Sequence, residues 1–221
     1  MLLVVLWRLR YTLSLRDLAE MFLERGFVFS HEAVREWEAR FAPLLIGRLR
    51  AKRRGQVGPR WHADETSVKV DGRWCSRYRA IDRAGNLIEV LLSEKRDMDA
   101  AQRFFMQDLD LVGQAPEQGT TAGHEAYPRA IRETLGGAVI HRTSRYKNNR
   151  IAQDHRAVQQ RDYPLRGFGS FASAARCCPA FEQQRQYFRA VATAGQVVSR
   201  GDRRRMFQER WAIIMAELVA A

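Results

Sequence analysis

The sequence predicts an α/β protein with a helical head, a mixed-sheet domain and C-terminal helices. Apolar residues recur at helical spacing from about residue 2 to 54 and change to strand spacing at Trp61. Three strand patterns are followed by alternating helix and strand patterns, which is typical of a mixed sheet. The expected divisions are a head over residues 1–54, a basic linker over 55–60, the sheet domain over 61–190 and a C-terminal basic segment with an amphipathic helix over 191–221.

The head contains clear signals for helix ends. Ser14 and Asp17 have the spacing of a capping box, and Gly26 supplies the left-handed residue that commonly follows a helix. Ser30 is expected to cap the next helix, and Pro43 is expected to kink or end it.

A helix, a glycine-containing turn and a second basic helix are typical of a helix-turn-helix. In that motif the second helix enters the major groove of DNA, so Arg35 and Arg40 are candidate DNA-binding residues. A small helical bundle without a DNA-binding role has the same pattern and is the alternative.

Positive charge is in excess along the chain. It has 37 Lys and Arg against 25 Asp and Glu, a net charge of +12. This excess favours a polyanionic partner because each neutralised phosphate releases counterions. Charge alone is equally compatible with a basic protein that has no nucleic-acid role. Lys52, Arg53 and Arg54, at the end of the head, are predicted to contact phosphates, with a solvated helix end as the alternative.

Neither a membrane span nor a disulfide framework is predicted. The apolar run at residues 1–6 is far shorter than the roughly 20 residues that a bilayer requires, and it lacks the features of a signal peptide. Cys75, Cys177 and Cys178 have neither disulfide nor zinc spacing. We therefore expect reduced thiols in a cytoplasmic protein.

The sheet domain is expected to begin with a strand that carries an acidic residue at its centre. Burying Asp64 among apolar neighbours is costly without a metal or a cationic partner, and hard cations such as Mg²⁺ bind carboxylates. Asp64 is thus a candidate metal ligand; a solvated carboxylate on an exposed face is the alternative. Glu65 points to the opposite face and is expected to be structural or solvated. The expected elements are strands at 61–70, 74–81, 87–92, 120–121 and 138–141, and helices at 97–111, at 127–135 and from residue 148 or 149.

Six segments follow one another along the chain: HADETSVKVDGRW (62–74), YRAID (78–82), TAGHEAY (121–127), RYKNN (145–149), QDH (153–155) and RGF (166–168). Together they resemble bacterial insertion-sequence transposases of the DDE type, named for two aspartates and a glutamate, and in particular the insertion sequence six family. The resemblance runs from about Leu6 to Phe188. Family members usually begin further upstream, so the head is expected to be truncated at Met1.

The resemblance implies a ribonuclease H-like core that cleaves and joins DNA strands by two-metal phosphoryl transfer. It also implies Mg²⁺, with Mn²⁺ as a substitute, as the cofactor. The implied partners are the terminal inverted repeats of an element, target DNA and further copies of the chain in a homo-oligomer. A location at the bacterial nucleoid follows from the same resemblance.

Two of the three metal-binding positions of that family hold alanine in this chain. The first aspartate falls on Asp64, the second on Ala122 and the glutamate on Ala152. A methyl group cannot coordinate Mg²⁺, so we expect impaired catalysis, either in an inactivated genomic copy or through deliberate mutation. Replacement by neighbours is not expected. Asp154 lies about 200° around the helix from Ala152, Glu125 lies beyond the strand end, and the His124 imidazole suits Zn²⁺ better.

DNA binding is expected to survive better than catalysis. Basic residues cluster near the start of the former catalytic helix, where they are predicted to contact phosphates; a basic solvated face is the alternative. The C-terminal stripe of Phe207, Trp211, Ile214 and Leu218 is expected to pack on the core or to join two subunits, and Arg203–Arg205 form another basic cluster. The candidates in the first cluster are Arg142, Arg145, Lys147, Arg150, His155 and Arg156.

Two other functions remain open at this point. One is a non-catalytic DNA-binding remnant or dominant-negative subunit of the same ancestry. The other is a metal-dependent nuclease with an unrelated substrate, against which the helical head argues.

Overall fold

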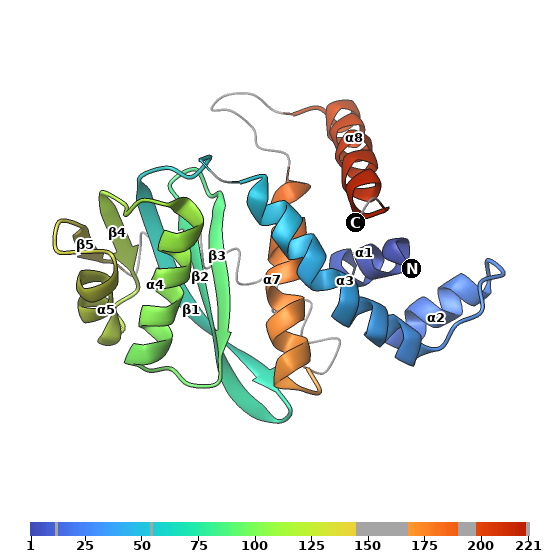
Figure 1. Cartoon of the computed structure of the whole chain (residues 1–221), viewed down its shortest axis with the longest axis horizontal. Coiled ribbons are helices and arrows are strands. Elements are labelled where there is room, and N and C mark those ends of the chain that lie inside the picture. The colour runs from blue at the N-terminus through green and yellow to red at the C-terminus, as the bar shows by residue number, and fades with distance from the viewer. Residues whose placement is uncertain (12, 54, 145–167, 190–197, 220–221) are drawn as a thin grey trace. The chain divides into compact units, whose positions relative to one another are not determined.

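The computed structural model describes residues 1–11, 13–53, 55–144, 168–189 and 198–219 (Figure 1). The chain divides into two compact units. The helical unit comprises Met1–Leu49 and Ala180–Ala221, and the sheet unit comprises Arg50–Pro179. Within the described ranges, no helix has the length and hydropathy needed to cross a membrane.

The helical unit begins with α1 (Leu2–Arg10), α2 (Leu15–Leu23) and α3 (His31–Ala51). The predicted capping box at α2 is confirmed: the Asp17 amide donates to Ser14 Oγ at 3.0 Å, and the Ser14 amide donates to Asp17 Oδ2 at 2.7 Å. Gly26 has φ +80°, as its place after α2 requires. The Ala33 amide donates to Ser30 Oγ at 3.2 Å, which confirms the predicted cap of α3.

Pro43 does not end α3, contrary to one of the two expectations for it. The helix continues for two further turns to Ala51. A proline inside a helix costs roughly 3 kcal/mol. Leu45, Ile46 and Leu49 lie beyond it and are buried. At about 1.5–3 kcal/mol for each buried aliphatic side chain, their burial outweighs that cost.

The sheet unit contains a five-stranded mixed sheet with the order β3-β2-β1-β4-β5. β1 pairs antiparallel with β2, and β2 with β3, whereas β1 with β4 and β4 with β5 are parallel. The predicted α/β class and the mixed sheet are therefore confirmed. The strands are β1 (Arg60–Val70), β2 (Arg73–Asp82), β3 (Leu87–Ser93), β4 (Gln118–Thr121) and β5 (Ile140–Thr143), and the connecting helices are α4 (Met98–Val112) and α5 (Ala126–Thr134).

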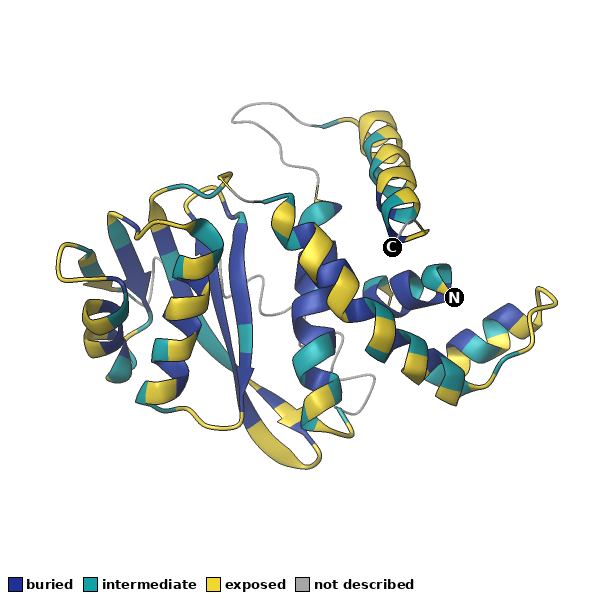
Figure 2. Cartoon of the chain, viewed as in Figure 1, coloured by how far each residue is buried: buried dark blue, intermediate teal, exposed yellow. Residues whose placement is uncertain are grey.

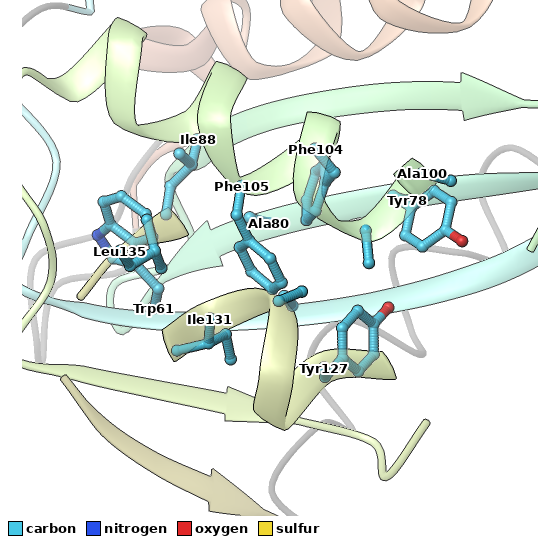
Figure 3. Packing of buried hydrophobic residues seen from close by; sticks show 13 residues of the cluster. Trp61, Tyr78, Ala80, Ile88, Ala100, Phe104, Phe105, Tyr127, Ile131 and Leu135 are labelled. Carbon is cyan, nitrogen blue, oxygen red and sulfur yellow. The ribbon is translucent and has the colours of Figure 1, made fainter. Parts of the chain in front are cut away.

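One face of this sheet packs against α4 and α5. Trp61 and Ala63 of β1 lie in one apolar cluster with Phe104 and Phe105 of α4 and Tyr127 of α5 (Figure 3). The alternation of side chains along β1 directs these residues and Glu65 to the same face. The alternate residues His62, Asp64, Thr66, Val68 and Val70 belong to the opposite face.

The opposite face packs against α7 (Phe171–Tyr187), a helix that the sequence patterns did not predict. Val68, Val70 and Cys75 form a second cluster there with Ala174 of α7. Helix prediction relies on one apolar and one polar face. Residues 177–180 and 182–184 of α7 are buried without interruption by exposed positions, and Glu182, Gln183 and Gln184 are among them (Figure 2). A polar residue that is buried contributes nothing to an apolar stripe, so the helix has no such pattern.

Candidate active site

Asp64 lies in the middle of β1, on the face away from α4 and α5. Its side chain is half-buried, and the residue opposite it on β2 is Arg79, of which 2% is exposed. The pairing of the two strands therefore places a cationic residue opposite Asp64.

Ala122 follows β4 at the point where β4 runs beside Asp64. The parallel register between the two strands ends at the pair Ala63 and Thr121. Asp64 follows Ala63, and Ala122 follows Thr121, the last residue of β4. Neighbouring strands lie about 4.8 Å apart. Position 122 therefore lies near Asp64, directly after the last paired residues of the two strands.

The described residues do not fit a two-metal site. No group of three or more His, Cys, Asp and Glu side chains is placed to hold a metal ion within the ranges that the structure covers. Asp64 is the one carboxylate at this position of the sheet among them, and a hard divalent cation needs several oxygen ligands. Ala152, the family's third position, lies outside the described residues.

His124 and Glu125 lie at the start of α5. His124 Nδ1 accepts a hydrogen bond from the Ala126 amide at 3.2 Å, and its ring packs edge-on against Tyr127. Glu125 is exposed and occupies the N-cap position of α5. The expectation that these neighbours do not replace the missing aspartate stays a prediction.

Glu65, next to Asp64 on β1, binds side chains from two other segments of the chain. Its carboxylate accepts a hydrogen bond from the Tyr127 hydroxyl and, at 3.1 Å, from Arg96 Nε. The Glu65 side chain is 8% exposed. Burial, together with the Glu65 charge, raises the pKa of Tyr127 well above its ordinary value. The hydrogen bond that Arg96 donates to Glu65 raises the pKa of Arg96.

This cluster of Glu65, Tyr127 and Arg96 fixes the loop that carries Ala122. The loop connects β4 to α5; Tyr127 lies in the first turn of α5 and binds β1 through Glu65. At the other end of the loop, Thr121 Oγ1 and His141 Nε2 lie 2.9 Å apart and join β4 to β5. Sequence reasoning placed Glu65 on the correct face but missed its partner, because nothing local relates β1 to a residue 62 positions further along.

A family model described as a DDE domain matches residues 58–198. The chain is 34% identical over 157 residues to the transposase for insertion sequence-like element IS431mec of Staphylococcus aureus (strain Mu50), covering 69% of each chain.

The chain belongs to the DDE transposase family.

A second relative agrees with this assignment. The transposase for insertion sequence element IS257 in transposon Tn4003 of Staphylococcus aureus is 32% identical over 157 residues, again covering 69% of each chain. The resemblance to the insertion sequence six family is thereby confirmed. Among solved structures, the HTLV-2 integrase catalytic core domain in complex with magnesium matches 65% of this chain and 96% of its own, with 14% identity and a TM-score of 0.45.

The basic residues predicted for this DDE transposase occupy different environments. Arg35 and Arg40 are exposed on α3, and Arg142 is exposed on β5. Lys52 is half-buried. Arg53 donates to the Ile88 carbonyl at 3.1 Å and to the Leu87 carbonyl, and burial lowers its pKa to about 10. The remaining candidates, Arg54, Arg145, Lys147, Arg150, His155 and Arg156, lie outside the described residues.

Proposed function

We propose that this chain is a bacterial insertion-sequence transposase that binds DNA but is impaired in cleaving and joining strands. DNA strand transfer is the activity that its family implies. The observation that carries the proposal is Ala122, which follows β4 beside Asp64 where the family has its second aspartate.

The physical reason for impaired catalysis is the loss of ligands. Two-metal phosphoryl transfer requires carboxylates from separate elements that converge on ions about 3.5–4 Å apart. Asp64 supplies one carboxylate, and neither Ala122 nor Ala152 supplies another. Asp64 is accordingly proposed as a residual metal ligand with reduced affinity for Mg²⁺ or Mn²⁺.

DNA binding rests on different residues and is proposed to persist. The net charge of +12 favours phosphates, and Arg35 and Arg40 are exposed on the second helix of the candidate helix-turn-helix. The proposed partners are the terminal inverted repeats of the element, target DNA and further copies of the chain, with action at the bacterial nucleoid.

The decisive experiment compares the chain with its Ala122→Asp plus Ala152→Glu variant. Strand cleavage and transfer are measured with Mg²⁺ on duplexes from the ends of the element that encodes it. The matched control, Ala122→Asn plus Ala152→Gln, has side chains of the same size without the charge. We expect activity in the carboxylate variant alone. Equal activity in the unchanged chain would mean that other residues bind the metal, and the proposed impairment would be wrong.

The same substitutions test the alternative role as a dominant-negative subunit. The unchanged chain is mixed in increasing proportion with the carboxylate variant on a fixed amount of DNA. A subunit that assembles but does not react lowers the activity more steeply than dilution does, whereas a binding remnant that does not assemble lowers it only by competing for DNA ends.

A further inference from the structure

We propose that the helical unit contains a second DNA-contacting site, a groove that binds the phosphodiester backbone. The guanidinium groove, as we call it, is lined by Arg10 of α1, Phe188 just after α7, and Arg203, Arg204 and Phe207 of α8 (Arg200–Val219). The inference rests on the proposed DNA binding, and it adds a site distinct from Arg35 and Arg40.

The groove consists of two adjoining cavities within the helical unit. One, of about 330 Å³, is lined by residues that include Arg10, Arg185 and Phe188, and the other, of about 790 Å³, includes Arg10, Arg203 and Phe188. Both volumes suit a ligand-sized group. Four arginines line the two cavities, and neither lining contains an acidic residue. A cleft lined by charges of one sign concentrates the field and attracts the opposite charge.

Arg10 is held in place by aromatic rings and keeps its N–H groups available. Its guanidinium carbon lies 4.5 Å from the ring centre of Phe207 and 5.0 Å from that of Phe188. Stacking of this kind uses the ring faces and leaves the donor edge of the guanidinium open to a phosphate. Neither a hydrogen bond nor an ion pair to an acidic residue is made by this guanidinium within the described ranges.

α8 presents its arginines beyond the part of the helix that is packed. Phe207 and Trp211 stack on each other and pack at a tilt against Phe188, which anchors that face of the helix. Arg203 and Arg204 precede Phe207 by four and three residues, so they lie on the same side one turn earlier, and both are exposed. Asp202, the acid within this basic turn, is bound to Ser199 Oγ at 2.7 Å.

The ligand that this arrangement fits is a run of phosphates. Convergent guanidiniums bind phosphate oxygens with paired N–H donors, and several of them at one groove match a repeating anion better than a single one. Contacts of this type orient a protein on DNA without reading its sequence. The groove is therefore expected to strengthen binding to all DNA sequences to the same extent.

The test is the salt dependence of binding by the full chain. Anisotropy of a labelled duplex from the element's ends, and of one with unrelated sequence, is recorded between about 50 and 200 mM salt. The slope of log K against log salt is negative, and each lost phosphate contact lowers its magnitude by about 0.9. Arg203→Gln plus Arg204→Gln is expected to lower it by about 1.8 on both duplexes, and Arg10→Gln by about 0.9.

A charge-matched control separates this site from general electrostatics. Arg129→Gln plus Arg132→Gln removes the same charge from the exposed side of α5 in the sheet unit and is expected to leave the slope unchanged. Circular dichroism and thermal unfolding verify that each variant folds. An unchanged slope in the Arg203 and Arg204 variant would overturn the inference but leave DNA binding intact. A chain that binds neither duplex would overturn the proposed function as well.

Discussion

For two tyrosines in the core of the sheet unit, the structure predicts opposite effects of substitution by phenylalanine on the free energy of unfolding. Tyr127 and Tyr78 are 0% and 1% exposed and belong to the same apolar cluster (Figure 3). The Tyr127 hydroxyl donates to the Glu65 carboxylate. The Tyr78 hydroxyl is buried and has no hydrogen-bond partner among the described residues. Replacing either residue with phenylalanine removes one buried oxygen, so each variant is the control for the other.

The expected magnitudes follow from those contacts. A hydrogen bond to a charged group contributes about 1.5–3 kcal/mol, and a buried polar group without a partner costs about 1–3 kcal/mol. Tyr127→Phe should therefore lower the free energy of unfolding by about 1.5–3 kcal/mol. Tyr78→Phe should leave it unchanged or raise it by up to about 1 kcal/mol.

Urea unfolding of both variants, and of Glu65→Gln alone and combined with Tyr127→Phe, measures the effect. The double-mutant cycle isolates the interaction between the two side chains. Equal losses from the two tyrosine variants, or a coupling energy below about 0.5 kcal/mol between Glu65 and Tyr127, would refute the reasoning.

The pH dependence of the free energy of unfolding tests the burial of the Tyr78 hydroxyl independently. Burial raises the pKa of Tyr78 from 10.0 to about 12. Between these values the unfolded chain loses the phenolic proton while the folded chain retains it. The stability that this group contributes is therefore present below pH 10 and is lost as the pH rises towards 12. Wild type should lose more stability over this range than Tyr78→Phe, as measured by urea midpoints.

Three further substitutions test the fold. Ser14→Ala removes the capping box of α2 and should cost about 1 kcal/mol in urea unfolding. Phe104→Ala, at a fully buried position, should cost about 3–5 kcal/mol by the same measurement, and a loss under 1 kcal/mol would contradict its place in the core. Burial, with the charge of Glu89, raises the pKa of Asp108 well above 3.8, so its contribution to stability falls as the pH rises from about 4. Asp108→Asn should flatten that dependence, as measured by urea midpoints across the range.

Residues that signal their structure locally were predicted well. The alternation along β1 placed Asp64 and Glu65 on opposite faces, and Ser14, Asp17 and Gly26 marked the ends of α2. Such signals act within a few residues, so no tertiary information is needed to read them. The strand patterns in turn predicted the mixed sheet on which Asp64 is placed.

Where a structural feature had no local signal in the sequence, its prediction failed or was incomplete. α7 lacks an apolar stripe because polar residues such as Glu182 and Gln183 are buried with the apolar ones. Arg53 was expected to meet phosphates, and this expectation is untested, but its guanidinium is bound to carbonyls of β3. The burial of the polar residues of α7 and the partners of Arg53 both depend on segments that are distant in the sequence.

By itself, the sequence determined the α/β class, the caps at Ser14, Gly26 and Ser30, the family motifs and the alanines at positions 122 and 152. Only the tertiary structure decided that Ala122 follows the strand beside Asp64, that Tyr127 binds Glu65 and that Arg10 joins Arg203 at one groove. The physical reason is the sequence separation over which each kind of interaction acts. Periodicity and capping are set by neighbours in the chain, whereas strand order, register and convergent charges arise when distant segments bury their apolar faces together.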